Sequence, residues 1–126
     1  MGERGAAVGD LRLATVVVNA LDMRRAIAFW QEALGYELGG EIGEQFAMLE
    51  DPAKRGPAVL VQQAEAIPRE AAPVHIDLYT AERERHIERL VQLGASRVED
   101  WDYPEEHEFV VLRDTEGNEF CVIRAD

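Results

Sequence analysis

The stretch that decides the fold is VHIDLYTAERERHIERLVQLG, residues 74–94. Apolar and polar residues alternate in its first third, which predicts a strand, and Ile87, Leu90 and Val91 then recur at helical spacing. The stretch LRLATVVVNALDMRRAIAFWQEALG, residues 11–35, has the same order: a β-rich run, an amphipathic helix and a closing Leu-Gly. The two stretches therefore predict an internal repeat whose copies each begin with a strand and a helix.

Each predicted helix has residues typical of helix ends at its start and at its end. Asp22 is placed to cap the first helix and Gly35 to end it, and Thr80 and Gly94 are expected to do the same for the second. Short strands are predicted over 36–42, 45–51 and 57–63 after the first helix, and over 96–100, 108–114 and 118–125 after the second. Each half is thus expected to have the order β-α-β-β-β.

A single unit of this kind leaves one sheet face exposed, so two units are expected to form one domain. The predicted fold is α+β: two tandem βαβββ modules that form a paired, half-open mixed-sheet barrel around a cavity. A length of 126 residues predicts one domain over 1–126. The first module is expected over about 11–63 and the second over about 74–125, with a proline-containing linker over 64–73.

Composition excludes several classes of protein. Thirteen basic and 25 acidic residues give a net charge of −12, which disfavours nucleic acid and favours a cationic small molecule as partner. No apolar run reaches the length of about 18 residues that a membrane span requires. The N-terminus lacks the apolar core of a secretory signal, and the one cysteine, Cys121, cannot form an internal disulfide. We therefore expect a cytoplasmic protein that binds neither nucleic acid nor membrane.

Strand alternation predicts which side chains line the cavity. His75, Asp77 and Tyr79 share one face of their strand, and the apolar residues between them are expected to face the helix. Three polar side chains on an inner face indicate a binding pocket, and the alternative is an ordinary solvent-exposed sheet face. In the loop after the second module's first short strand, Trp101 and Tyr103 are expected to stack on a flat ligand or to cover a sheet edge. The predicted apolar walls are Phe46, Met48, Leu60, Phe109 and Val111.

Four segments together resemble the vicinal-oxygen-chelate superfamily of glyoxalase I, bleomycin-resistance proteins and extradiol dioxygenases, and most of all its glyoxalase-like branch. They are DMRRAIAFWQEALGY (22–36), VHIDL (74–78), LGA (93–95) and VLRDTEGNEFCV (111–122). The resemblance covers the chain from Leu11 to Arg124 and implies the two-module fold given above. It also implies a homodimer, because members of the superfamily commonly pair modules across a dimer interface.

In the metal-dependent members, each module gives one ligand from its first strand and one from its last. Carried onto this chain by the resemblance, those positions are Thr15, Gln62, His75 and Cys121. Only His75 is a ligand of the kind that those enzymes use, since threonine and glutamine are weak donors for zinc or nickel. We therefore expect no cofactor. The alternative is a divalent metal held by His75 and Cys121 with help from Asp77 or Glu119.

These observations predict a protein that binds a small organic molecule, cationic or aromatic, without a catalytic metal, in the manner of drug or natural-product sequestration. The residues expected to contact the ligand are Thr15, Gln62, Tyr79, Trp101, Tyr103 and Cys121. The alternative is a lyase, isomerase or dioxygenase that uses His75 with Asp77 as its catalytic residues, with or without a divalent metal. A thiolate–imidazole pair of Cys121 and His75 is a further alternative.

Overall fold

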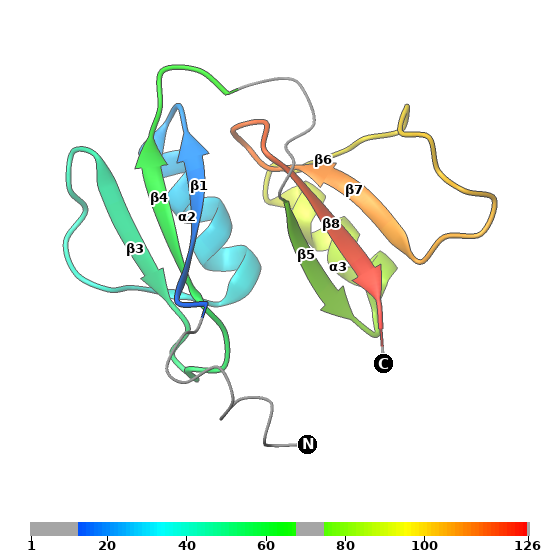
Figure 1. The fold of residues 1–126 in the computed structure, drawn as a ribbon, viewed down its shortest axis with the longest axis horizontal. Helices are drawn as coiled ribbons and strands as arrows, with labels where there is room; N and C mark the ends of the chain where they lie inside the picture. The colour runs from blue at the N-terminus through cyan, green and yellow to red at the C-terminus, as the bar shows by residue number, and fades with distance from the viewer. Residues whose placement is uncertain (1–12, 68–74, 126) are drawn as a thin grey trace.

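The computed structural model of the chain describes residues 13–67 and 75–125. The predicted order of elements is confirmed (Figure 1). The first module contains β1 (Thr15–Ala20), α2 (Met23–Leu34), β2 (Glu37–Leu38), β3 (Phe46–Glu50) and β4 (Ala58–Gln63). The second contains β5 (Ile76–Thr80), α3 (Arg83–Gln92), β6 (Ser96–Arg97), β7 (Phe109–Arg113) and β8 (Glu119–Arg124). Parts of the predicted linker, residues 68–73, lie outside the described residues.

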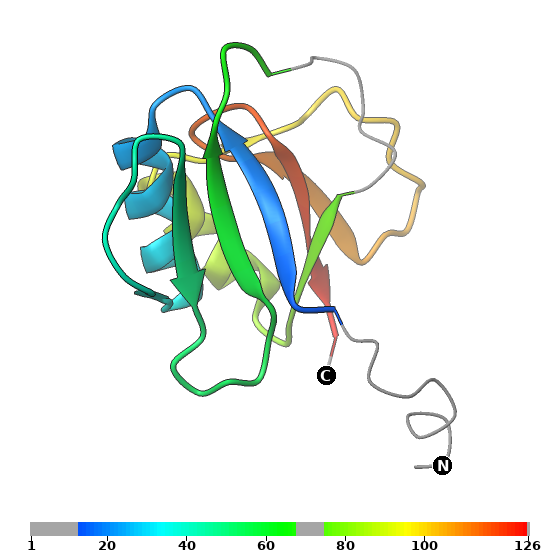
Figure 2. The same cartoon turned by 60° about the vertical axis from the view of Figure 1, so that its left-hand side comes forward.

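Each module forms its own four-stranded mixed sheet with the same topology. The orders are β1-β4-β3-β2 and β5-β8-β7-β6, with the first strand parallel to the last and the other pairs antiparallel. Both helices lie on one side of the strands, behind them in Figure 1, and the turned view of Figure 2 shows the same arrangement. The two sheets do not join into one closed barrel. The α+β class and the half-open arrangement of two βαβββ modules are therefore confirmed.

The first helix begins and ends where the sequence predicted. The Asp22 side chain accepts a hydrogen bond from the backbone N–H of Arg25 at 3.2 Å, and Gly35 ends the helix at a φ of 68°. Glycine adopts this left-handed conformation without the steric cost that a side chain adds. The buried face of α2 contains Met23, Ala26, Ile27, Phe29 and Trp30.

The predicted start of the second helix is wrong by two residues. The N-cap position is Glu82, which makes no side-chain cap, and the helix begins at Arg83. The Thr80 hydroxyl instead accepts the backbone N–H of Glu82 at 3.0 Å, in the local turn that threonine commonly forms. The short strands predicted over 36–42 and 96–100 also shrink to two residues each, β2 and β6.

One apolar core serves both modules. Trp30 of α2 packs edge-on against Phe29 and against Phe120 of β8, each with ring centroids 5.1 Å apart. Edge-to-face aromatic pairs at this spacing add to the stabilisation from area burial. The core continues from the first sheet through both helices to Leu112 and Val122 of the second. None of the helices in the described part of the chain is long and apolar enough to cross a membrane.

Candidate functional site

The open face of the second sheet, on the side away from the helices, carries the predicted polar strand. Ile76 and Leu78 of β5 pack against the core, so His75, Asp77 and Tyr79 point the other way and are exposed. Tyr79 keeps 70% of its surface in contact with solvent. The predicted division of the strand into two faces is therefore correct.

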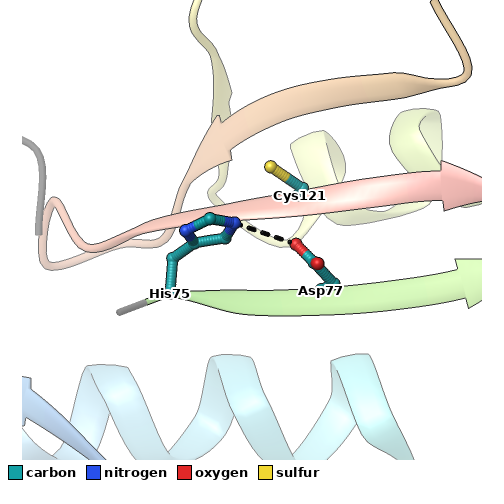
Figure 3. A group of neighbouring side chains, drawn as sticks. All are labelled: His75, Asp77 and Cys121. Carbon is teal, nitrogen blue, oxygen red and sulfur yellow. Dashed lines mark ion pairs between the residues drawn. The ribbon is translucent and has the colours of Figure 1, made fainter. Parts of the chain in front are cut away.

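Strand pairing places a third reactive side chain beside this row. Asp77 of β5 is in register with Cys121 of β8, and both side chains lie on the open face (Figure 3). Nε2 of His75 lies 3.1 Å from Oδ1 of Asp77. A ligand atom from each of His75, Asp77 and Cys121 lies within 4.8 Å of the other two. We call these three residues the β5–β8 trio.

The trio combines an accessible pair with a sheltered thiol. The side chains of His75 and Asp77 are 50% and 41% exposed, whereas Cys121 is buried. Burial, together with the carboxylates of Asp77 and Glu119, raises the pKa of the Cys121 thiol to about 11. The thiol is therefore neutral near pH 7, which argues against a thiolate nucleophile activated by His75.

A small apolar cluster forms the floor next to the trio. Val98, Val111 and Cys121 are buried in it, with Phe109 and Ile123 packed against them. This cluster is separate from the main core and lies on the open face of the second sheet. The open face thus presents polar groups along β5 and apolar ones toward β7.

The two aromatic residues of the 99–108 loop differ in what they do. The Tyr103 hydroxyl donates to the carbonyl of Val98 and accepts the N–H of Val111, both at 2.9 Å, so it fastens the loop across the sheet edge. The Tyr103 ring stacks on His107 with centroids 4.6 Å apart. Trp101, in contrast, is 37% exposed. The two predicted roles were stacking on a flat ligand and covering a sheet edge. The contacts of Tyr103 are those expected of a residue that covers a sheet edge.

Two other predicted ligand contacts lie on the first sheet. Thr15 pairs with Ala58, and Gln62 pairs with Asn19, so they occupy opposite ends of the β1–β4 ladder. Val17 lies between them on the open face of the first sheet, where it exposes apolar surface. The structure therefore brings together His75, Asp77 and Cys121 and places Thr15 and Gln62 in the other module.

The structure also contains a hollow of about 320 Å³ beside the 99–108 loop. It is lined by Arg97, Val98, Glu99, Tyr103, His107 and Val110. None of these belongs to the trio, so the prediction that a cavity encloses the β5 side chains stays a prediction.

Sequence reasoning missed the role of two buried carboxylates between β7 and β8. Asp114 accepts the indole N–H of Trp30 at 2.9 Å and the backbone N–H groups of Glu116 and Asn118. The side chain of Glu116 is fully buried and accepts bonds from the backbone of the β1–α2 turn and from Arg25. These residues join the second module to the first.

The pKa of Glu116 reflects this network. Burial alone would raise it, but hydrogen bonds from Arg25, from the Asp22 N–H and from Thr115 outweigh burial and hold the pKa below its usual value. The signal in the sequence was the segment DTEGN, residues 114–118, which lies within the motif already noted for its resemblance.

Comparison with known proteins gives one family. The model of the glyoxalase-like domain matches residues 15–123. No curated protein matches the chain.

Solved structures of similar fold are numerous and distant in sequence. The fosfomycin resistance protein FosX from Listeria monocytogenes is 16% identical, with a TM-score of 0.72 over 91% of each chain. A glyoxalase/bleomycin resistance protein/dioxygenase family enzyme from Burkholderia phytofirmans is also 16% identical, with a TM-score of 0.70 over 90% of this chain and 98% of that one. A glyoxalase-related enzyme from Fulvimarina pelagi is 13% identical, with a TM-score of 0.67 over 90% and 88%. At these identities the likeness concerns the fold alone.

Proposed function

This chain belongs to the glyoxalase-like domain family, and from that premise we propose that it binds a small organic molecule on the open face of its second sheet. His75, Asp77 and Tyr79 would orient the ligand by hydrogen bonds, and no catalytic metal would be needed. The observation that carries the proposal is the exposed His75–Asp77 pair, 3.1 Å apart, beside the apolar floor around Val111. A few convergent polar groups against an apolar surface are typical of small-molecule sites.

The charge of the chain favours a cationic or aromatic ligand. Asp77 is an exposed carboxylate at the centre of the site, and the whole chain carries a net charge of −12. Such a field raises the local concentration of cations and speeds their association. Trp101, which is 37% exposed on the 99–108 loop, offers a surface for a cation or a flat ring. Sequestration of a drug or natural product is the role that this ligand chemistry supports.

A thermal-shift screen of cationic and aromatic compounds, run in the presence of a chelator, tests the proposal. A ligand at 100 times its Kd stabilises the folded chain by about 2.7 kcal/mol, an easily measured shift in Tm. We expect His75→Ala and Asp77→Asn to remove the shift, and His86→Ala, on helix α3, to keep it. A ligand whose shift survives both β5 substitutions would show that it binds elsewhere.

The same pair favours proton transfer as a second candidate function. A carboxylate 3.1 Å from an imidazole nitrogen orients the ring, the arrangement used in general base catalysis. A lyase or isomerase would then use His75 to take a proton from the substrate and Asp77 to hold the imidazolium. The test is incorporation of solvent deuterium into recovered ligand, which should be lost in His75→Gln and reduced in Asp77→Asn. Binding without exchange would leave sequestration as the function.

The metal used by one structural relative does not suit these residues. A FosX variant has been crystallised with Mn(II) and a dihydroxypropylphosphonic acid. Manganese favours carboxylate, carbonyl and water oxygens, and in a catalytic site it acts as a Lewis acid on the substrate. Here the last-strand position holds the Cys121 thiol and the first-strand position of module one holds Thr15. The donors at these positions therefore do not fit manganese.

We further propose that the chain is one domain that forms homodimers in the cytoplasm. The core shared by both modules supports a single domain. Val17 and Phe46 expose apolar surface on the open face of the first sheet, which a second copy would cover. Light scattering coupled to gel filtration tests the dimer. The free thiol of Cys121 agrees with a reducing compartment.

A further inference from the structure

Three side chains of different metal-binding chemistry meet at one point of the second sheet. Two of them, His75 and Asp77, come from alternate positions near the start of β5, and the register of β8 sets Cys121 beside Asp77. An imidazole nitrogen, a carboxylate oxygen and a sulfur atom thus lie within 4.8 Å of one another. Among the residues that the structure describes, none from the first module takes part.

We propose that the β5–β8 trio is a binding site for a divalent transition-metal ion of the zinc class, complete within one module. Imidazole, thiolate and carboxylate are the three ligand types that zinc uses in proteins, whereas magnesium and manganese favour oxygen alone. This site differs from the ligand positions that the family resemblance implies, because both Thr15 and Gln62 are left out and Asp77 is added.

The spacing of the trio suits tetrahedral coordination. With bonds of about 2.0–2.2 Å to nitrogen and oxygen and about 2.3 Å to sulfur, ligand atoms around zinc lie roughly 3.3–3.6 Å apart. Nε2 of His75 and Oδ1 of Asp77 are already 3.1 Å apart. The largest separation allowed within the trio, 4.8 Å, closes to this range by a side-chain movement of roughly 1 Å. The half-exposed histidine and aspartate leave room for water as a fourth ligand.

Asp77 rather than Glu119 supplies the carboxylate. Glu119 is held by Arg113, whose Nη2 donates to its Oε2 at 3.0 Å. Asp77 already faces the imidazole of His75 and is directly opposite Cys121 in the ladder. Substitutions of Asp77 and Glu119 therefore form a matched pair: Asp77 belongs to the trio, whereas Glu119 lies on the same sheet outside it.

Metal at the trio would occupy the polar atoms that we assign to the organic ligand, so the two should compete. This consequence, unlike the site itself, rests on the proposed function. It makes the ion a regulator of binding rather than a catalytic cofactor.

Titration of chelator-treated protein with Co²⁺ tests the site through its spectrum. Cobalt bound by a thiolate gives a near-ultraviolet charge-transfer band and the visible bands of tetrahedral cobalt, and Zn²⁺ should displace it while Mn²⁺ at equal concentration should not. We expect Cys121→Ser to lose the charge-transfer band. Asp77→Asn should weaken cobalt binding by at least the roughly 10- to 100-fold typical of losing a supporting partner, and Glu119→Gln should stay within a few-fold of the parent.

Either of two results would overturn the site: no charge-transfer band in the parent chain, or equal cobalt affinity in the Asp77 and Glu119 variants. Asp77 is exposed, so its substitution leaves the fold intact even if the Cys121 variant folds poorly. The ligand screen in chelator is independent of this titration. A cobalt site without any organic ligand would refute the proposed function alone, and a ligand without a cobalt site would refute this inference alone.

Discussion

Replacing Glu116 by alanine should weaken the connection between the two modules. Oε1 of Glu116 accepts the backbone N–H groups of Leu21 and Asp22 at 2.8 and 2.7 Å. Oε2 accepts Nε of Arg25 at 2.7 Å and the hydroxyl of Thr115 at 3.0 Å. The side chain has no exposed surface, so the carboxylate is the acceptor for these four donors.

The magnitude follows from which donors lose their acceptor. Arg25 is 52% exposed, so it can turn to water. The two backbone N–H groups are fixed in the β1–α2 turn, and each costs about 1–3 kcal/mol if left unsatisfied. Water reaches part of this turn, because Leu21 is 46% exposed. We therefore expect the free energy of unfolding to fall by about 2–4 kcal/mol in Glu116→Ala, or roughly 4 °C in Tm for each kcal/mol.

Urea unfolding of the parent and variant chains measures this change as a shift in midpoint at constant slope. Arg25→Ala is the matched control: it removes the exposed partner of the same network and should cost clearly less than Glu116→Ala. If Glu116→Ala costs no more than this control, the carboxylate does not satisfy the turn as described.

The dependence on pH gives a second check of the same reasoning. The pKa of Glu116 is lowered in the folded chain, so its contribution to stability is complete above the unfolded value of about 4.3 and is lost as pH falls through the folded pKa. The difference in unfolding free energy between the parent and Glu116→Ala should therefore shrink in acid. A difference that grows in acid would contradict the assigned direction.

Three further predictions follow from contacts described above. Tyr103→Phe removes the hydroxyl that bridges Val98 and Val111 and should cost about 1–3 kcal/mol of unfolding free energy, measured in urea; an unchanged midpoint would show that water replaces it. Cys121 should react slowly with iodoacetamide at pH 7, because burial raises its pKa to about 11, and mass spectrometry should show fast labelling only in the unfolded chain. Gly35→Ala should cost about 1–2 kcal/mol because of its φ of 68°, and a smaller loss of Tm would mean that the helix end relaxes.

The sequence was sufficient to predict the fold because the repeat appears in local signals. The Asp22 side chain caps the start of the first helix, and the backbone of Gly35 adopts the left-handed conformation that ends it. Both properties can be expected from the residue type alone. The prediction that Thr80 caps the second helix was wrong because a threonine hydroxyl can accept an N–H either at a helix N-terminus or in a turn just outside it. Periodicity does not distinguish these two uses.

The candidate site was predictable only in part. Alternation placed His75, Asp77 and Tyr79 on one face, since it depends on one strand alone. The approach of Cys121 depends on the register of β8 against β5, which a one-residue slip would have changed. The burial of Glu116 depends on the docking of two modules, and no local pattern in an acidic turn indicates that.

The turns before β4 and β8 share one hydrogen-bonding pattern but contribute differently to the molecule. Asp51 and Asp114 occupy equivalent positions, and each accepts the N–H groups two and four residues ahead, at Ala53 and Arg55 or at Glu116 and Asn118. Where the first turn has an alanine, the second has the carboxylate that reaches across to the other module. A chain built from two copies of the first half would keep the plan of the fold but lack this carboxylate, so the two halves are not interchangeable.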